Sequence, residues 1–416
     1  MLRSYKTELK PTAEQIHKIN GSIGTCRFVY NFFLAENQKR YAQGEKFMSG
    51  YDFQKWLNNE YLPQHPEYEW VKETSSKAVK QSIMNADGAY RRFFQGKAGF
   101  PRFKKKGKSE AKMYFVKTDR KAVIHCERHR IKIPTVGWVR LKEKNYIPTD
   151  AEHFVIKSGH VSKQGDRYYV SVLVEQETPW YKNSKKCSAG RIEGKDRGVG
   201  IDLGIKDLAI CSDGTTYKNV NKSGKVRKLE KQKRRIQRGL SRMIEANIIG
   251  YTGSSETKNR RPVFAKPLQE CKNYQKRKEE LKRTSQRLAN IRHSYTDCVT
   301  SEIVNRKPRF LCIEDLNVKG MMKNKHLSKA VAQQNFYEFR REITYKAQWN
   351  GIPLMIADRW FPSSKTCSCC GHIKKDLKLS DRTFVCPACG TRMDRDFQAR
   401  INLERYGDKE ICKMTL

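Results

Sequence analysis

The chain has 416 residues and carries 85 lysines and arginines against 44 acidic residues, which gives a formal charge of +41. A positive surplus of this size indicates a polyanionic partner, and nucleic acid is the first candidate because binding its phosphates releases counterions. The sequence has neither a long apolar segment nor an N-terminal signal core, so a membrane protein and a secreted protein are disfavoured and we expect an intracellular protein.

Residues 12–94 are predicted to be mainly helical. Thr12 and Gln15 stand at the spacing of a capping box, which marks a helix start. A clearer helix is expected near residues 75–94, where apolar side chains recur on one stripe. Lys77 and Gln81 project almost opposite that stripe, one turn apart, so they are candidates for reading a base edge or holding a phosphate. A solvated polar face is the alternative interpretation.

A basic cluster at residues 99–106 ends this helical region and adds Lys104 as a further candidate for binding nucleic acid. From residue 113 to residue 175 the pattern changes to that of strands, with a good hairpin turn at residues 164–167. We interpret this part as a small β-barrel into which the helical region is inserted. The polar, lysine-rich residues 176–195 mark the main boundary of the chain.

The second half is predicted to contain a β-hairpin at residues 208–214 and then two long helices. In the first helix, apolar side chains recur at alternating three- and four-residue steps, and residues 222–242 contain ten basic residues against one acid, Glu230. A solvated face is the usual explanation of a charge run, but this imbalance exceeds what solubility needs. We therefore expect Arg234, Arg235 and Arg238 to contact phosphates.

Four of the thirteen cysteines show the spacing of a metal site, namely Cys367 with Cys370 and Cys386 with Cys389, fifteen residues apart. This spacing is typical of a zinc ribbon, and four thiolates make a closed site whose zinc would be structural. Cys369, inside the first pair, is a less well-spaced ligand, and unligated thiols are the alternative. A disulfide framework is not expected in a large basic chain of this kind.

Three acidic residues far apart in the sequence are candidates for a second metal site. Asp202 and Glu314 each end a short apolar run of the kind that forms a buried strand, and Asp396 follows the cysteines where a helix would begin. Carboxylates from separate elements suit Mg²⁺, which prefers oxygen ligands, and two such ions could clamp a phosphodiester. Asp202 could instead be a turn residue, and Asp315 or Asp394 could replace its neighbouring acid.

Taken together, these segments resemble the TnpB family, whose members are transposon-encoded, RNA-guided DNA endonucleases related to the compact type V CRISPR effectors. The resemblance rests on the runs Gly200-Ile201-Asp202-Leu203-Gly204, Ile313-Glu314-Asp315-Leu316-Asn317, Ser363-Ser364-Lys365-Thr366-Cys367-Ser368-Cys369-Cys370-Gly371, Cys386-Pro387-Ala388-Cys389-Gly390 and Asp394-Arg395-Asp396. Their order and spacing match across residues 195–405. The N-terminal half agrees more loosely, through residues 89–94 and the basic cluster.

The resemblance implies a multidomain fold of α/β and α+β type. An RNase H-like, RuvC-type nuclease domain with an inserted helical hairpin and a zinc ribbon would follow a β-barrel wedge domain, which itself contains an inserted helical recognition lobe. The boundaries expected on this basis are residues 1–12 and 101–185 for the wedge barrel, 13–100 for the recognition lobe, 186–365 for the nuclease domain with its insertion at 222–300, 366–392 for the zinc ribbon and 393–416 for the last nuclease segment.

The same resemblance assigns cofactors and partners. It implies that Asp202, Glu314 and Asp396 hold two Mg²⁺ ions and cut both strands of a target DNA, beside a short flanking motif that Lys77 and Gln81 would read. One structural Zn²⁺ would belong to the four cysteines. A guide RNA and double-stranded target DNA are the implied partners, in the prokaryotic cytoplasm at the nucleoid. The sequence does not decide between a monomer and a dimer.

Two residues depart from the family's usual run after the third acid. Gln398 stands in place of Asn, and Arg400 stands in place of Ala, where its cation could compete with the metal or contact DNA phosphate. A guided DNA-binding repressor that no longer cuts is therefore one alternative, and an unguided RNase H-like enzyme, such as a resolvase or a transposase, is another. All three carboxylates are present, which favours the nuclease.

Overall fold

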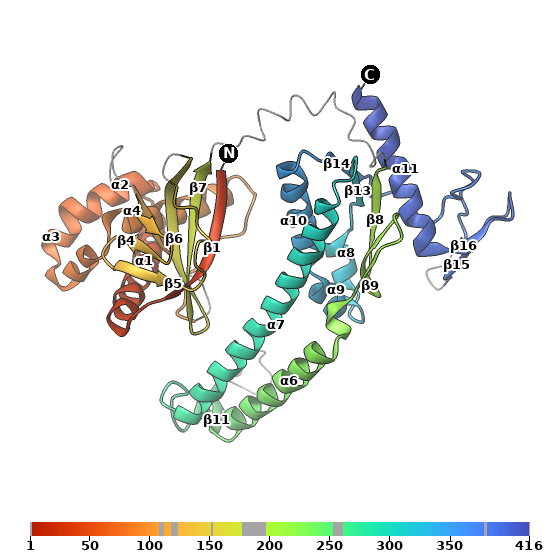
Figure 1. Ribbon diagram of the computed structural model, residues 1–416. Coiled ribbons are helices and arrows are strands. Elements are labelled where there is room, and N and C mark those ends of the chain that lie inside the picture. The colour runs from red at the N-terminus through yellow and green to blue at the C-terminus, as the bar shows by residue number, and fades with distance from the viewer. Residues whose placement is uncertain are drawn as a thin grey trace. The chain divides into compact units, whose positions relative to one another are not determined.

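The computed structural model describes residues 2–107, 112–117, 124–150, 153–176, 197–252, 261–377 and 381–415. Two units are distinguished along the chain, Met1–Pro179 and Trp180–Leu416, and each is considered by itself (Figure 1). The predicted boundary between residues 185 and 186 lies outside the described residues. No helix in the described ranges combines the length and the apolar character needed to cross a membrane.

The helices of the first unit follow directly on its first strand, β1 (Leu2–Lys10). They are α1 (Ala13–Ala42), α2 (Gly50–Trp56), the π-helical turn η1 (Leu57–Tyr61), α3 (Leu62–Gln64), the 3₁₀ segment η2 (Pro66–Glu73) and α4 (Ser76–Phe94). The predicted capping box is confirmed, because the Gln15 amide donates to Thr12 Oγ1 while the Thr12 amide donates to Gln15 Oε1. The helix expected near residues 75–94 is also confirmed, as α4.

The strands of the first unit form one seven-stranded antiparallel sheet. Besides β1 they are β2 (Met113–Val116), β3 (Cys126–Glu127), β4 (Arg130–Ile133), β5 (Gly137–Leu141), β6 (Phe154–Gln164) and β7 (Arg167–Gln176). Their order is β2-β6-β7-β1-β5-β4-β3, and the predicted hairpin turn joins β6 to β7. Val170, Val172 and Val174 alternate along β7 and are fully buried, so one face of the sheet covers a core. Closure of this sheet into a wedge barrel stays a prediction.

The second unit is built around a five-stranded sheet. Its strands are β8 (Val199–Leu203), β9 (Asp207–Cys211), β10 (Thr216–Lys218), β13 (Leu311–Glu314) and β14 (Leu354–Ala357). In the order β10-β9-β8-β13-β14, the last three are parallel neighbours, whereas β9 and β10 return antiparallel as the predicted hairpin. Parallel strands covered on both faces read as continuous apolar runs, and Ile201, Leu311 and Ile313 are accordingly fully buried.

Two long helices follow the hairpin, as predicted. They are α6 (Gly224–Glu245), which begins after the short turn η3 (Val220–Lys222), and α7 (Lys272–Asn305), with the strands β11 (Ile248–Thr252) and β12 (Arg261–Phe264) between them. They lie side by side (Figure 1), packed on Val226, Leu229 and Leu288. Across this seam Arg292 Nη2 donates to Glu230 Oε1 at 2.8 Å, so the one acid of the basic segment pairs with α7.

Helices cover both faces of the five-stranded sheet. The remaining elements are α8 (Val318–Lys323), α9 (Ser328–Gln334), α10 (Phe336–Trp349), β15 (Thr383–Val385), β16 (Arg392–Asp394) and α11 (Arg395–Thr415). On one face, Ile313 packs in a core with side chains of α7 and α10. On the other face, Cys312 packs with Leu403 of α11. Alternate residues of β13 thus belong to two different cores. Glu314, two residues after Cys312, lies on the face that α11 covers.

Candidate active site and metal centre

Asp202 and Glu314 lie next to each other on the two central strands β8 and β13. These strands run parallel with Gly200 opposite Cys312, so Asp202 and Glu314 are the next pair on the same side. Side chains alternate between the two faces of a strand. Both acids therefore share the face of Gly200 and Cys312, which α11 covers.

The surroundings of Asp202 and Glu314 disfavour their charged forms. Burial raises the pKa of Asp202 well above its usual range, and the nearby carboxylates of Glu314 and Asp396, together with a hydrogen bond to Glu314, raise it further. Burial also raises the pKa of Glu314. Neighbouring carboxylates in a buried place disfavour the charged forms of one another. A bound divalent cation would favour the charged forms instead, and carboxylate oxygens are the ligands that a hard divalent cation prefers.

Asp396 comes to this face from the first turn of α11. The carboxylate of the neighbouring Asp394 caps the helix instead: Asp394 Oδ1 accepts hydrogen bonds from the amides of Asp396 at 2.9 Å and Phe397 at 3.0 Å. That arrangement is an N-cap, which satisfies amides that the first helical turn leaves free. Among the described residues, a cation contacts the side chain of Asp396: Arg395 Nη2 lies 3.4 Å from its Oδ1. Of the two acids, Asp396 is the one whose charge raises the pKa of Asp202.

The close approach of α11 to β8 depends on Gly200. A Cβ atom on Gly200 would lie 2.5 Å from the amide nitrogen of Glu404, and closer still to the carbonyl oxygen of Arg400. Backbone atoms cannot move aside as a flexible side chain can, so only glycine fits here. The helix is also fixed by Arg197, whose Nε lies 2.5 Å from Glu404 Oε1. The glycine two residues before Asp202 thus brings Asp396 to the sheet.

Asp315, the alternative to Glu314, is paired elsewhere. It forms ion pairs with Arg340 and with Arg359, whose Nη2 lies 2.6 Å from Asp315 Oδ2. Although burial opposes it, the hydrogen bonds from these two guanidinium groups lower the pKa of Asp315. Glu314 is instead hydrogen bonded to Asp202. Glu314 is therefore the acid of this pair that belongs with Asp202.

The two unusual residues of α11, Gln398 and Arg400, are both buried. Gln398 is fully buried, and within the described part of the chain neither its Oε1 nor its Nε2 has a hydrogen-bond partner. The guanidinium of Arg400 lies 4.0 Å from the centroid of the Phe397 ring and the residue is only 7% exposed. The cation that contacts Asp396 is Arg395. Of the two possibilities considered for Arg400, competition with a metal or contact with a DNA phosphate, this burial favours neither.

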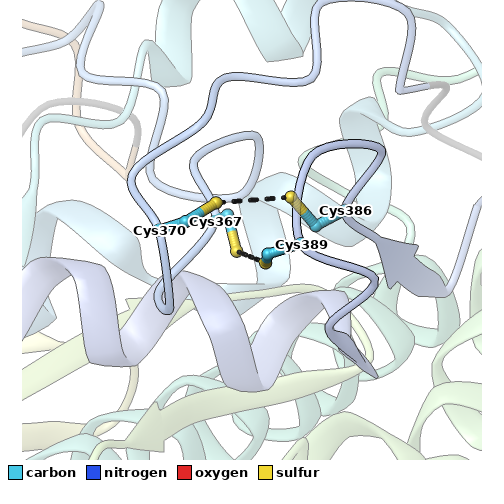
Figure 2. Close-up of side chains that lie close together, drawn as sticks. All are labelled: Cys367, Cys370, Cys386 and Cys389. Atoms are coloured by element: carbon cyan, nitrogen blue, oxygen red, sulfur yellow. Dashed lines mark hydrogen bonds between the residues drawn. The ribbon is translucent and has the colours of Figure 1, made fainter.

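The four predicted zinc ligands converge from two loops (Figure 2). Their sulfur atoms all lie within 4.8 Å of one another, and the Sγ atoms of Cys367 and Cys389 and those of Cys370 and Cys386 are 3.6 Å apart. In the described residues, no other group of three or more histidine, cysteine or acidic ligand atoms is this close together. Four thiolates at this spacing fit a structural zinc ion.

Tight turns place these cysteines. Gly371 and Gly390 follow the two cysteine pairs with φ of +76° and +72°, a conformation that glycine adopts without strain. Their amides donate to the carbonyl oxygens of Cys367 and Cys386. Cys369 is exposed and lies outside the four-sulfur group. The predicted ligand set is therefore the set that the fold brings together.

The two loops that carry Cys367 with Cys370 and Cys386 with Cys389, here called the zinc loops, are joined to the helix that holds Asp396. Strand β16 ends at Asp394 and α11 begins at the next residue. Asn402 of α11 donates through Nδ2 to the carbonyl oxygens of Ser363 and Thr366, both at 2.7 Å. Arg405 donates to the carbonyl oxygen of Ser368. The segment around the first cysteine pair is thus hydrogen bonded to α11, and the second cysteine pair is followed directly by β16 and α11.

The candidates for nucleic-acid binding differ in how accessible they are. Arg234, Arg235 and Arg238 are all exposed on α6. Lys77 is exposed on α4, whereas Gln81 is half-buried and donates to Asn85 Oδ1 at 3.1 Å.

Lys104 is in a different position from these surface residues. It is half-buried, with its Nζ 3.8 Å from the centroid of the Tyr30 ring. Its amide donates to Asn31 Oδ1 at 2.7 Å. Burial lowers the pKa of Lys104. These contacts hold the basic cluster against α1. Lys104 is therefore less accessible to nucleic acid than the sequence indicated.

One group of residues at the same edge of the sheet was not predicted from the sequence. A pocket after β13 and β14 is lined by Asp315, Arg340, Arg359 and Trp360, among others. The signal for it was the run Asp358-Arg359-Trp360, in which a basic and an aromatic residue directly follow an apolar strand.

Comparisons with known families agree along most of the chain. Residues 1–46 match a "Helix-turn-helix domain" of the OrfB/IS605 family, and residues 171–325 match the same family's domain described as "Probable transposase". Residues 336–403 match a "Cas12f1-like, TNB domain". The last segment contains the four cysteines and Asp396.

Individual relatives agree with these matches. The chain is 29% identical to "Putative RNA-guided DNA endonuclease InsQ" of Escherichia coli (strain K12), over 98% of this chain and 92% of that protein. It is 30% identical to TnpB-like protein L79 of Acanthamoeba polyphaga mimivirus, over 70% of this chain and 55% of that protein. A cryo-EM structure of a Cas12f1-sgRNA-target DNA complex has the same fold, with a TM-score of 0.55 and 14% identity over 94% of this chain and 83% of that one.

Proposed function

We propose that this chain is an RNA-guided endonuclease for double-stranded DNA. The premise is that it belongs to the TnpB/OrfB_IS605 family, which is related to Cas12f. The observation that carries the proposal is the meeting of three acids from distant segments. Asp202 and Glu314 stand side by side on parallel strands, and Asp396 is close enough to raise the pKa of Asp202. Burial of neighbouring carboxylates is costly, and a divalent cation bound between them would offset that cost.

The three carboxylates are assigned to two Mg²⁺ ions. Asp202 would contribute to both ions, and Glu314 and Asp396 would each help to hold one. When bound, such ions supply positive charge to the phosphodiester and assist the attack of water. The protein's own contribution is to fix the oxygen donors on a rigid sheet and on a helix that cannot shift past Gly200. We expect 5′-phosphate ends and cleavage of both strands in turn, beside a short flanking motif.

The five-stranded order, with its antiparallel hairpin and parallel central strands, supports assignment of the second unit to an RNase H-like, RuvC-type domain. The zinc loops would act as a structural ribbon that positions Asp396 through the start of α11. The seven-stranded sheet and its inserted helices would form the wedge and recognition parts. We assign the exposed arginines of α6, Arg234, Arg235 and Arg238, to phosphates of the guide RNA or of the target DNA, because their side chains face solvent.

Specificity in this proposal comes mainly from base pairing between guide and target. The protein would read only the short flanking motif, for which Lys77 and Gln81 remain the candidates. Binding should weaken steeply as salt rises, because many phosphates are neutralised by a chain of this charge.

The first test is to identify the RNA that the protein carries. The chain is expressed with its native flanking DNA and purified at high salt, and the bound RNA is sequenced. We expect one dominant RNA with a constant scaffold and a variable end. A heterogeneous mixture, or no RNA, would favour an unguided nuclease.

The second test is plasmid cleavage with that RNA and Mg²⁺. The wild type should cut a matched target, and Asp202→Ala should bind the same target without cutting it. If the wild type binds but is as inactive as Asp202→Ala, the protein is a guided DNA-binding repressor and the nuclease proposal is wrong.

A further inference from the structure

A pocket with cationic and aromatic walls lies at the same sheet edge as the acids. In the parallel register of β13 and β14, Glu314 stands opposite Ala357. The chain beyond Ala357 therefore leaves the sheet beside Glu314. Arg359 and Trp360 come from this exit, and Arg340 joins them from α10. In sheets with parallel strands, ligands bind at the carboxyl ends of the strands.

Trp360 stands on a turn that is held on both sides. The Asp358 side chain accepts the amide of Trp360 through Oδ1 at 2.8 Å, and the Phe361 amide donates to the Asp358 carbonyl oxygen at 3.0 Å. The Phe361 ring packs against Tyr406 of α11, with ring centroids 4.9 Å apart. Trp360 itself is 85% exposed. A fixed turn thus presents a large aromatic surface to solvent, where a base can stack on it.

Asp315 orients the two arginines without covering them. Its two carboxylate oxygens each take one guanidinium, from Arg340 and from Arg359. The side chains of these arginines remain 42% and 45% exposed. Asp358 also lines the pocket, so two acids balance the two guanidinium groups and the arginines contribute directed N–H donors, not a surplus of charge. Guanidinium N–H groups held in a fixed direction suit a phosphate, which they can bind with two parallel hydrogen bonds.

We propose that Trp360, Arg340 and Arg359 bind the single-stranded stretch of DNA next to the scissile bond. A base stacks on the indole of Trp360, and an adjacent phosphate lies on the arginines. This inference rests on the proposed function, since it takes the neighbouring acids as the cutting site. It requires single-stranded DNA at this place, because a paired and stacked base has no free face for the indole.

The test uses the full-length protein in complex with its guide RNA and a series of targets. Each target carries one abasic nucleotide at a successive position near the cut. With the wild type, we expect one abasic position to slow cutting about tenfold, from the usual strength of base–aromatic stacking. Trp360→Ala should slow cutting of intact DNA by about the same factor and should no longer respond to that abasic position.

Two variants and one binding measurement separate stacking from a structural role. Trp360→Phe keeps an aromatic face and should restore most of the rate together with the abasic response. Tyr41→Ala removes an equally exposed aromatic, 85% exposed, from the first unit, and should keep the wild-type abasic profile. Affinity for the intact target, measured by filter binding, should be the same for the wild type and Trp360→Ala. If Trp360→Ala cuts intact DNA at the wild-type rate, or responds to abasic positions as the wild type does, the proposal is overturned.

A second readout does not depend on cutting. The same target series carries 2-aminopurine, whose fluorescence is quenched by stacking, in place of the abasic nucleotide. One position should be quenched in the wild-type complex and bright in the Trp360→Ala complex, whereas equal fluorescence at every position would exclude the stacking. If the wild type does not cut at all, the proposed function fails, and this fluorescence alone decides the proposal.

Discussion

The four cysteines and the three acids are both predicted metal sites, but the fold assembles them in different ways. The cysteines come from two neighbouring loops, and two turns at Gly371 and Gly390 bring their sulfur atoms within 4.8 Å of one another. Of the acids, Asp202 and Glu314 are placed side by side by the register of β8 with β13, and Asp396 joins them because α11 packs closely on the sheet. Local turns set the geometry of the first site, and tertiary packing sets the geometry of the second. Changes in packing should therefore damage the acids and spare the cysteines.

The largest effect is expected from Asp202→Asn. Loss of a central ligand should lower the rate of guided cleavage on the order of a thousandfold or more, as for other residues that act as a unit. Target binding and zinc content should not change, since neither uses this carboxylate. Asp315→Asn is the matched control, because it neutralises the acid next to Glu314 that pairs with Arg340 and Arg359. We expect this variant to lower the rate of cleavage about tenfold at most, because Arg340 and Arg359 would lose the carboxylate that orients them. If both variants lost the same amount of activity, Asp202 could not be assigned as a metal ligand while Asp315 is assigned only to the arginines.

Zinc removal should have the next largest effect. Cys367→Ser is expected to lose bound zinc and to lower the free energy of unfolding by at least about 3 kcal/mol, because loss of a structural metal is among the costliest single changes. Cleavage should fall with it, since the zinc loops hold the start of α11. The measurements are metal content and thermal unfolding. Cys369→Ser, an exposed cysteine in the same loop, should retain both zinc and stability. Loss of zinc in the Cys369 variant would contradict the assigned ligand set.

Gly200→Ala tests the packing that assembles the acids. The added methyl group would meet the backbone of α11, and overpacking of this kind costs about 1–3 kcal/mol of stability. A shift of α11 of about 1 Å would move Asp396 and lower the cleavage rate about a hundredfold. Zinc content should be unchanged. Gly239→Ala places a methyl group in open space on α6 and should stabilise the protein by about 0.5–1 kcal/mol. A fully active Gly200→Ala variant would show that the acids do not need this contact.

The smallest effect should come from the exposed arginines. Substitution of Arg234, Arg235 and Arg238 together by Gln should weaken binding of the guide RNA or of the target DNA, so both are measured, without affecting the rate of cutting by the fully loaded complex. The slope of log affinity against log salt should fall by about one for each lost phosphate contact. Filter binding over a range of salt concentrations measures this slope. Lys413→Gln, an exposed lysine at the end of α11, serves as the control. An unchanged slope in the triple variant would mean that this face is only solvated.

The features that the sequence predicted well depend on short-range chemistry. The capping box at Thr12, the turn between β6 and β7 and the two cysteine pairs each need only neighbouring residues, so their residue types and spacing suffice. The acids were found in a different way, because apolar runs that end in an acid indicate buried strands. The parallel register then places Asp202 beside Glu314.

The features that the sequence did not predict depend on contacts between distant segments. The residue pattern alone left Asp394 and Asp396 open, and only the family resemblance chose Asp396. The N-cap that occupies Asp394 exists only once α11 begins at Arg395. The burial of Gln398 and Arg400 follows from the close approach of α11 to β8, which spacing does not reveal. Lys104 looked like a surface cation, but it lies over the Tyr30 ring. The pocket at Trp360 required the register of β13 with β14.

The central claim is that three distant segments form one site for divalent cations. Iron-directed cleavage tests it most directly: Fe²⁺ replaces Mg²⁺ in the zinc-loaded protein, and peroxide with ascorbate then cuts the polypeptide near the bound iron. We predict fragments that end near Asp202, near Glu314 and near Asp396, all suppressed together by excess Mg²⁺ and absent in Asp202→Asn. Fragments from only one of these segments, or fragments that persist in Asp202→Asn, would contradict the shared site.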